Sequence, residues 1–156
     1  MDAHTDRGLR DDDETFDELL SAFRQFELAH LRVLRRLLAD EGLNETDIRL
    51  VLLLSGPDTG GLTPTRVARA LDVTTGAVTI MLNRLTPRDI VVSVPNPDDR
   101  RSVLVRLGVA GERCRERVRS VYFSVFEDAF PHGDWERIGT RFVRLAAGLD
   151  SVSASR

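Results

Sequence analysis

Residues 63–107 constrain the fold most, because two short helical patterns there are followed directly by two β-branched runs. Thr63-Pro64 places an N-cap residue before proline at the first helical position, which predicts the start of a helix that ends near Leu71. After a four-residue turn, Thr74 caps a second helix, which Pro87 ends. Two short helices joined by such a turn form a helix-turn-helix.

The sequence pattern changes from helical to strand-like after this pair of helices. Residues 90–94 and 102–107 are β-branched runs of strand length, and the polar, turn-rich segment 95–101 lies between them. The pattern predicts a β-hairpin with a charged tip. A hairpin directly after the second helix of a helix-turn-helix is a wing.

Apolar residues recur at helical spacing on both sides of this segment. They predict a long first helix and two closing helices, and Asn44 with Asp47 in the capping-box position opens a further, almost wholly apolar helix. The expected fold class is mainly α with a small β-hairpin wing, a winged helix-turn-helix of about six helices. The outer helices carry more apolar surface than one small module covers, which predicts a homodimer.

The predicted organisation therefore has a DNA-binding centre between dimerisation helices. It comprises a disordered acidic tail over 1–13, a helical dimerisation region over 14–42 and 108–150, a winged helix-turn-helix over 43–107, and a flexible tail over 151–156.

The net charge of −3 hides an uneven distribution along the chain. Residues 1–18 hold two Arg against eight acidic residues, a net charge of −6. Residues 62–107 hold seven Arg against four Asp, a net charge of +3. Because the local charge governs attraction to phosphate, the composition is compatible with double-stranded DNA as a partner.

The sequence gives little support for a membrane protein, a secreted protein or an enzyme. No apolar run approaches the roughly 18–20 residues of a membrane span, and the acidic start is unlike a secretory signal. The single cysteine, Cys114, excludes an intramolecular disulfide and lies on an apolar helical stripe, where inert packing is expected. His4, His30 and His132 are scattered. We expect a cytoplasmic protein that is not an enzyme, with no cofactor, no metal site and no membrane partner.

The second helix of the pair has a polar outer face. With Val78 at the centre of the core face, steps of about 100° per residue place Gly76, Ala77, Ile80, Asn83 and Arg84 outward and Thr79 at the edge. Small residues allow close approach to DNA, Asn83 can pair with adenine, Arg84 with guanine or phosphate, and Ile80 can touch a thymine methyl. A merely solvated face is the alternative.

Two further groups of arginines support this interpretation. Arg66 and Arg69 project from the first helix of the pair, where phosphates would lie. For two surface arginines alone ordinary solvation is the better explanation, and their position in the motif is what favours a role in DNA binding. In the hairpin tip, the spacing of Asp99 and Arg101 allows the carboxylate to hold the guanidinium in one orientation. An oriented arginine on a narrow hairpin suits the minor groove; a solvent-exposed ion pair is the alternative.

Three segments together resemble the multiple-antibiotic-resistance regulator (MarR) family: residues 62–71, 73–85 and 96–107, the last followed by Gly111. The Asp-x-Arg of Asp99 and Arg101 is the most specific element, and the resemblance is strongest over 43–113. It implies a ligand-responsive repressor that acts as a homodimer on a pseudo-palindromic operator. It also implies an effector crevice between the dimer helices and the winged module, for a small aromatic or anionic compound.

The resemblance assigns roles by position. It places Thr74, Thr75, Thr79 and Arg84 of the second helix on DNA, Arg101 in the minor groove with Asp99 holding it, and Arg100 near phosphate.

Three residues could line the effector crevice, namely His30, Tyr122 and Trp135. Core or dimer-interface packing is the alternative for each of them.

The chain departs from the family pattern at several positions. Ile80 stands where a polar or basic residue is common, and Asp72 and Asp89 occupy turn positions that are usually Gly. Asp tolerates left-handed backbone better than most residues, so the turns are expected to persist. These departures predict weaker, more salt-sensitive DNA binding, and they leave open a winged-helix protein-interaction module with weak or no specific DNA binding.

Overall fold

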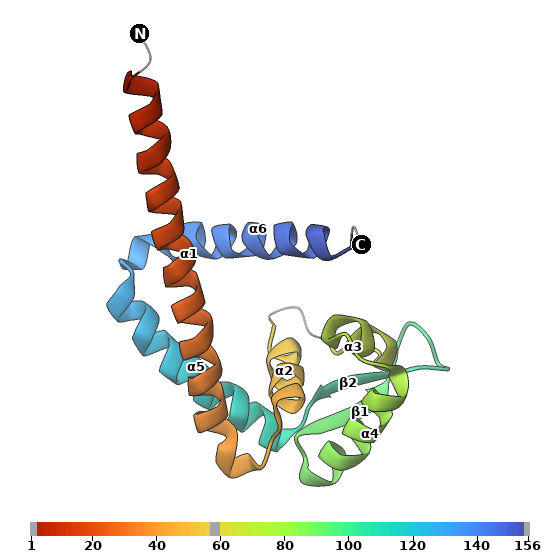
Figure 1. The fold of residues 1–156 in the computed structure, drawn as a ribbon. Coiled ribbons are helices and arrows are strands. Elements are labelled where there is room, and N and C mark those ends of the chain that lie inside the picture. The colour runs from red at the N-terminus through yellow and green to blue at the C-terminus, as the bar shows by residue number, and fades with distance from the viewer. Residues whose placement is uncertain (1–2, 57–59, 155–156) are drawn as a thin grey trace. The chain divides into compact units, whose positions relative to one another are not determined.

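A computed structural model describes residues 3–56 and 60–154, with the side chains of 13–56, 60–131 and 133–152 (Figure 1). The chain forms two compact units, Met1–Arg115 and Glu116–Arg156.

The first unit contains the predicted winged helix-turn-helix. Its elements run in the order α1 (Ala3–Leu38), the short 3-10 helix η1 (Ala39–Glu41), α2 (Glu45–Leu54), α3 (Pro64–Leu71), α4 (Thr75–Leu85), the 3-10 helix η2 (Thr86–Arg88), β1 (Val91–Pro95) and β2 (Val103–Leu107). Helix α5 (Val109–Ala129) begins in this unit and continues into the second, which also holds η3 (His132–Asp134) and α6 (Trp135–Ala154). The described residues thus form six α-helices and a two-stranded sheet, which confirms the predicted fold class.

Helix α2 is the most buried helix of the first unit, as its apolar sequence predicted. Its N-terminus has the predicted capping box: Asn44 Oδ1 accepts the Asp47 backbone N–H, and Asp47 Oδ2 accepts the Asn44 N–H, each at 2.9 Å. The core around it consists of buried aliphatic side chains from α1 to β2, namely Leu34, Leu38, Ile48, Leu50, Val51, Leu54, Val67, Ala68, Leu71, Val78, Met81, Leu85, Ile90, Val91 and Val105.

Two aspartates adopt the left-handed backbone that was expected of them. Asp72, after α3, has φ 54°, and Asp89, after η2, has φ 53°. The Asp72 N–H donates to the Arg69 carbonyl at 3.3 Å, which closes α3 and starts the turn to α4. The turn between the two helices therefore has its usual geometry although it lacks glycine.

The hairpin is antiparallel, with a register from Val91 opposite Leu107 to Pro95 opposite Val103. A third segment joins its edge, since Leu62 and Val105 exchange backbone hydrogen bonds of 3.0 and 2.8 Å. The tip is closed by a hydrogen bond of 2.8 Å from Asn96 Nδ2 to Ser102 Oγ. Strand β2 is thus paired on both sides, with β1 and with Leu62, at the base from which the wing projects (Figure 1).

Asp89 fastens the base of this hairpin to the start of α5. Its carbonyl accepts the N–H groups of Ala110 and Gly111 at 3.0 and 3.3 Å, and its Oδ2 accepts the Val109 N–H at 3.2 Å. A Cβ on Gly111 would lie only 2.1 Å from the Ile90 carbonyl oxygen. The close approach of helix and strand therefore requires glycine at this position.

The helices at both ends are longer than predicted. Helix α1 begins at Ala3 instead of near residue 14, and α6 continues to Ala154 instead of ending near residue 150. The predicted disordered acidic tail is thus helical from residue 3 onward. At the other end Ser151 Oγ donates to the Gly148 carbonyl at 2.7 Å. Residues 1–2 and 155–156 of the predicted tails lie outside the described residues.

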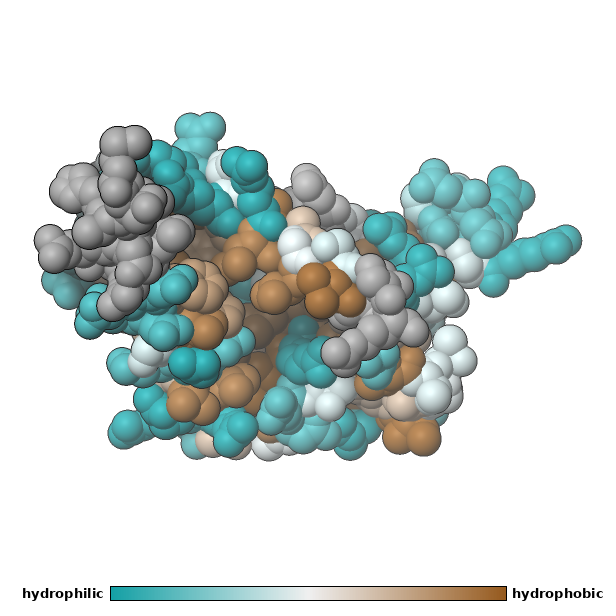
Figure 2. All heavy atoms as spheres, turned by 45° about the horizontal axis from the view of Figure 1, so that its top comes forward, coloured by the Kyte–Doolittle hydropathy of each residue, from teal (hydrophilic) through white to brown (hydrophobic). Residues whose placement is uncertain are grey.

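Several large apolar side chains of the outer helices are exposed to solvent. Figure 2 shows apolar surface lying open among hydrophilic side chains. The exposed apolar residues on α1, α5 and α6 include Phe16, Leu19, Leu28, Val125, Val143, Leu145, Leu149 and Val152. Even so, none of the helices in the described part of the chain is both long and apolar enough to cross a bilayer.

The contact at Gly111 leads to a stability prediction. Replacing Gly111 with Ala should lower the free energy of unfolding by about 1–3 kcal/mol, because the methyl group would collide with a backbone carbonyl. Urea unfolding followed by circular dichroism measures the change. Gly139→Ala in α6 is the matched control, since a Cβ there meets nothing within 4 Å. Equal stability of the two variants would contradict the packing.

Candidate nucleic-acid interface

Helices α3 and α4 are positioned by threonine caps. Thr63 Oγ1 accepts the Arg66 N–H at 3.3 Å at the start of α3, and Thr74 Oγ1 accepts the Ala77 N–H at 3.1 Å at the start of α4. Pro64 occupies the first turn of α3. These caps satisfy N–H groups that a helix leaves unpaired at its start, so each helix begins at a defined residue.

The outward face of α4 agrees closely with the prediction. Gly76, Thr79, Asn83 and Arg84 are exposed, Ala77 is half-buried, and Val78, Met81 and Leu85 are buried. Ile80 is 71 % exposed. Thr74 and Thr75 are also exposed at the start of the helix, where Thr79 Oγ1 donates to the Thr75 carbonyl at 3.1 Å. The helix therefore presents small, polar and apolar groups together, the mixture that base edges require.

The predicted arginines of α3 and of the wing are likewise open to solvent. Arg66 and Arg69 are exposed on α3, and Arg100 and Arg101 are exposed at the hairpin tip. These four guanidinium groups lie on the module that carries α4, so its exposed surface is rich in positive charge. Their contacts with DNA remain predictions.

Asp99 contacts the backbone of Arg101 in this structure, and its predicted hold on the Arg101 guanidinium stays a prediction. Its Oδ1 accepts the backbone N–H of Arg101 at 3.0 Å, and among the described side chains it forms no ion pair with the Arg101 guanidinium. A carboxylate two residues before an N–H in a tight turn reaches that N–H more readily than the end of a long side chain. Asp99 thus shapes the turn and leaves the guanidinium exposed.

The guanidinium of Arg84, for which a DNA contact was predicted, is bound within the protein. Nη1 donates to Asp47 Oδ2 at 2.8 Å and Nη2 donates to Asp47 Oδ1 at 2.6 Å. The Asp47 side chain is 0 % exposed and that of Arg84 is 41 % exposed. The hydrogen bond to the carboxylate raises the pKa of Arg84, outweighing the opposite effect of burial. Contact of this guanidinium with guanine, as predicted, would therefore compete with its two hydrogen bonds to Asp47.

The sequence offered no signal for this pairing. Asp47 was identified through its place in the capping box, and Arg84 through its place on the outer face of α4, but 37 positions separate the two residues. Only the packing of α2 against the helix-turn-helix brings them together. The capping of α5 by Asp89 was missed for the same reason.

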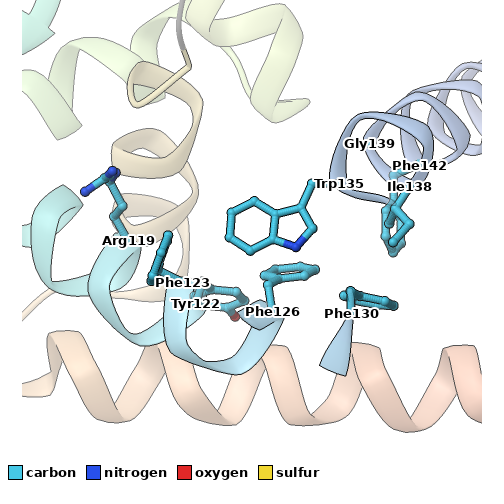
Figure 3. Close-up of a pocket in the computed structure, with 9 residues that line it drawn as sticks. All are labelled: Arg119, Tyr122, Phe123, Phe126, Phe130, Trp135, Ile138, Gly139 and Phe142. Atoms are coloured by element: carbon cyan, nitrogen blue, oxygen red, sulfur yellow. The ribbon is translucent and has the colours of Figure 1, made fainter. Parts of the chain in front are cut away.

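The second unit holds an aromatic cavity of about 340 Å³. Figure 3 shows Trp135 of α6 lying over Phe126 of α5, and the Trp135 ring meets Phe123 edge to face with 5.5 Å between centroids. Arg119 stands at the edge, where Nη1 forms an ion pair of 3.0 Å with Glu116. Of the three predicted effector residues, Tyr122 and Trp135 line this cavity. Burial raises the pKa of Tyr122.

His30 is not among the residues that line this cavity. It lies on α1 in the other compact unit and stacks on Phe26 with 6.0 Å between ring centroids. Spacing along the sequence could not reveal this, because His30 lies far from the other two residues in the chain. Its assignment to an effector pocket remains a prediction.

Cys114 is fully buried on α5, where an apolar packing role was predicted. Among the side chains that the structure describes, no group of three or more His, Cys, Asp or Glu residues could hold a metal ion.

Comparison with known proteins identifies the family. The profile of the MarR family matches residues 41–102. The multiple antibiotic resistance protein MarR of Escherichia coli K12 is 31 % identical over 117 residues, which cover 70 % of this chain and 80 % of that protein. The chain belongs to the MarR family. The MarR protein of Salmonella typhimurium LT2 is 37 % identical over 79 residues, and this alignment covers 48 % of the chain but only 55 % of the relative.

Solved structures of regulators share the fold. A mutant MepR from a multidrug-resistant Staphylococcus aureus clinical isolate has a TM-score of 0.70 at 16 % identity, over 84 % of this chain and 96 % of that one. The transcriptional regulator Tm0710 of Thermotoga maritima has a TM-score of 0.59 at 18 % identity, over 92 % and 99 %. A complex of S. aureus MepR with DNA has a TM-score of 0.53 at 18 % identity, over 83 % and 98 %. The chain therefore has the fold of MarR-family transcription regulators.

The ion pair of α4 predicts an effect on stability. Arg84→Met should lower the free energy of unfolding by on the order of 3 kcal/mol, because it leaves the fully buried Asp47 carboxylate without its cation. Chemical denaturation measures this loss. Arg49→Met, at an exposed position of α2, should change stability by no more than about 0.5 kcal/mol. Indistinguishable variants would contradict the pairing.

The half-buried position of His30 predicts a dependence of stability on pH. Burial lowers its pKa below the ordinary value of 6.5, so the unfolded chain binds a proton at a higher pH than the folded chain. The wild-type chain should therefore lose stability as the pH falls from about 7 to about 5, and His30→Gln should lose less. Thermal unfolding at several pH values tests this. Parallel pH profiles for the two proteins would refute it.

Proposed function

We propose that the chain is a sequence-specific DNA-binding transcription regulator, a ligand-responsive repressor that acts as a homodimer on a pseudo-palindromic operator. The observation that carries this proposal is the exposed face of α4 beside the exposed arginines of α3 and the wing. The Ile80 side chain is 71 % exposed, so most of its apolar surface is left uncovered by the described residues. Contact with a thymine methyl in the major groove would cover this surface.

The charge of the module supports the same function. Arg66 and Arg69 would approach backbone phosphates from α3, while Thr75, Gly76, Thr79 and Asn83 of α4 would face base edges. Arg101 extends from a turn that Asp99 and Asn96 hold in shape. An arginine on such a narrow tip suits the negative potential of the minor groove, with Arg100 near the backbone.

Dimerisation is supported by the apolar side chains that the outer helices expose. Leu19 on α1 and Leu145 and Leu149 on α6 are 64, 48 and 57 % exposed, which is costly in water unless another surface covers them. A two-fold dimer presents two copies of α4, so its operator should be an inverted repeat whose half-sites lie about one helical turn apart.

The aromatic cavity of the second unit supports ligand response. Its walls of Tyr122, Phe126 and Trp135 suit a small aromatic compound, since offset and edge-to-face ring contacts are favourable. A fold relative, S. aureus MepR, has been solved with ethidium bromide bound. For this chain we propose an aromatic effector, with no catalytic step and no cofactor.

The test begins with selection of DNA from a random duplex library by the wild-type chain. Binding to the selected duplex and to a scrambled one is then measured between about 50 and 200 mM salt. We expect a preference of roughly 10³ or more for the selected sequence. Arg101→Ala should weaken specific binding about 10- to 100-fold, the range of one lost base-pair contact.

Arg49→Ala is the matched control, since Arg49 is exposed on α2 outside the proposed interface. It should bind as the wild type does. Failure of the wild-type chain to select any sequence at low salt would refute DNA recognition and favour a winged-helix protein-interaction module.

A further inference from the structure

We propose that Arg84 is a positioning residue of the recognition helix: its ion pair with buried Asp47 sets the orientation of α4, and its guanidinium does not read a base. The inference rests on the proposed function, because the orientation of α4 matters for DNA recognition. It assigns to the Asp47–Arg84 pair a role in operator specificity.

The geometry shows a fixed, two-point attachment. Each carboxylate oxygen of Asp47 accepts a hydrogen bond from one terminal nitrogen of Arg84: Oδ2 from Nη1 at 2.8 Å and Oδ1 from Nη2 at 2.6 Å. Asp47 is itself held, since its Oδ2 also accepts the Asn44 N–H at 2.9 Å within the capping box of α2. A fork of this kind restricts direction as well as distance. Movement of the Arg84 end of α4 therefore strains two hydrogen bonds at once.

The rest of the contact between α4 and the core lacks such directionality. Its buried face consists of Val78, Met81 and Leu85. Burial of this apolar stripe fixes which face of α4 points inward, but because the hydrophobic effect is non-directional it restricts small rotations about the helix axis less sharply than paired hydrogen bonds do. A small rotation displaces the tips of Thr79 and Asn83 relative to base edges, where hydrogen bonds tolerate little error. The ion pair supplies the missing constraint from α2, whose Leu50 and Val51 are fully buried.

The same geometry argues against direct readout. Bidentate recognition of guanine by arginine requires two N–H groups aimed at O6 and N7. In Arg84 one N–H of each terminal nitrogen already donates to a carboxylate, so the end-on pair of N–H groups is not available to a base. The negative charge of Asp47 also offsets the attraction of this guanidinium to phosphate, because the two charges lie within hydrogen-bond distance. Arg84 thus acts on DNA through the neighbouring residues of α4.

The decisive experiment compares Asp47→Asn, Arg84→Lys and the double variant with the wild type. Asp47→Asn keeps the shape of the side chain but removes its negative charge. Arg84→Lys keeps the positive charge but removes the pair of terminal nitrogens that binds both carboxylate oxygens. Each protein is titrated with the duplex selected by the wild-type chain and with its scrambled form, at several salt concentrations. Circular dichroism and thermal unfolding confirm that each variant is folded at the assay temperature. Arg49→Lys is the matched control.

Positioning predicts that both single variants lose about 10- to 100-fold of affinity for the selected duplex but bind scrambled DNA as the wild type does. The losses should not add in the double variant, because either change alone releases the helix. The salt dependence on scrambled DNA should be unchanged in Arg84→Lys. A purely structural role would lower the melting temperature without changing the preference for the selected duplex.

Direct contact by Arg84 predicts a different pattern. Asp47→Asn would then free the guanidinium, tighten binding and steepen the salt dependence by up to about 0.9 per added phosphate contact. That result would overturn the inference while leaving the proposed function intact, as would an unchanged preference in both single variants. If the wild-type chain itself selects no sequence, the proposed function fails and the inference fails with it.

Discussion

The Asp47 carboxylate joins the local structure of one helix to the placement of another. Within α2 it completes the capping box with Asn44, and across the module it receives both terminal nitrogens of Arg84. A fully buried carboxylate is tolerated only when its hydrogen bonds and its charge are satisfied. The geometry that satisfies Asp47 also connects α4, the helix with the exposed Ile80, to the most buried helix of the unit.

A second aspartate has a comparable role at the base of the wing. Asp89 combines a left-handed backbone with three hydrogen bonds to the start of α5. The hairpin is thereby tied to α5 at one end and to Leu62 along its edge. The exposed tip with Arg100 and Arg101 consequently extends from a fixed base. Both aspartates carry negative charge on the module that is proposed to bind DNA, and the carboxylate of each accepts hydrogen bonds from N–H groups of the protein.

The second unit has a different physical character. Its cavity is lined by the rings of α5 and α6, and further apolar side chains of α6 are exposed. Aromatic walls suit a flat apolar ligand, and exposed aliphatic residues suit a second copy of the chain. Dimerisation and effector binding, both proposed for this protein, would therefore use neighbouring surfaces of the same helices. This provides a physical route for a ligand to influence the dimer.

The sequence alone determined the elements and their faces, because these depend on neighbouring residues. Caps at Asn44, Thr63 and Thr74, the spacing of Val78, Met81 and Leu85, and the β-branched runs of the hairpin act over a few positions. The aspartates that replace glycine in the turns were also interpreted correctly, since left-handed backbone is a local property. Motif similarity added the family, which the comparisons then showed.

The tertiary structure alone decided which charged groups meet. The partner of Arg84 lies 37 positions away on α2, and the N–H groups that Asp89 caps lie about 20 positions further along the chain. No periodicity encodes such distances, because they depend on how whole helices pack. Asp99 is a local case: it could be placed in the wing from sequence, but whether it held a side chain or a backbone N–H followed from the path of the turn.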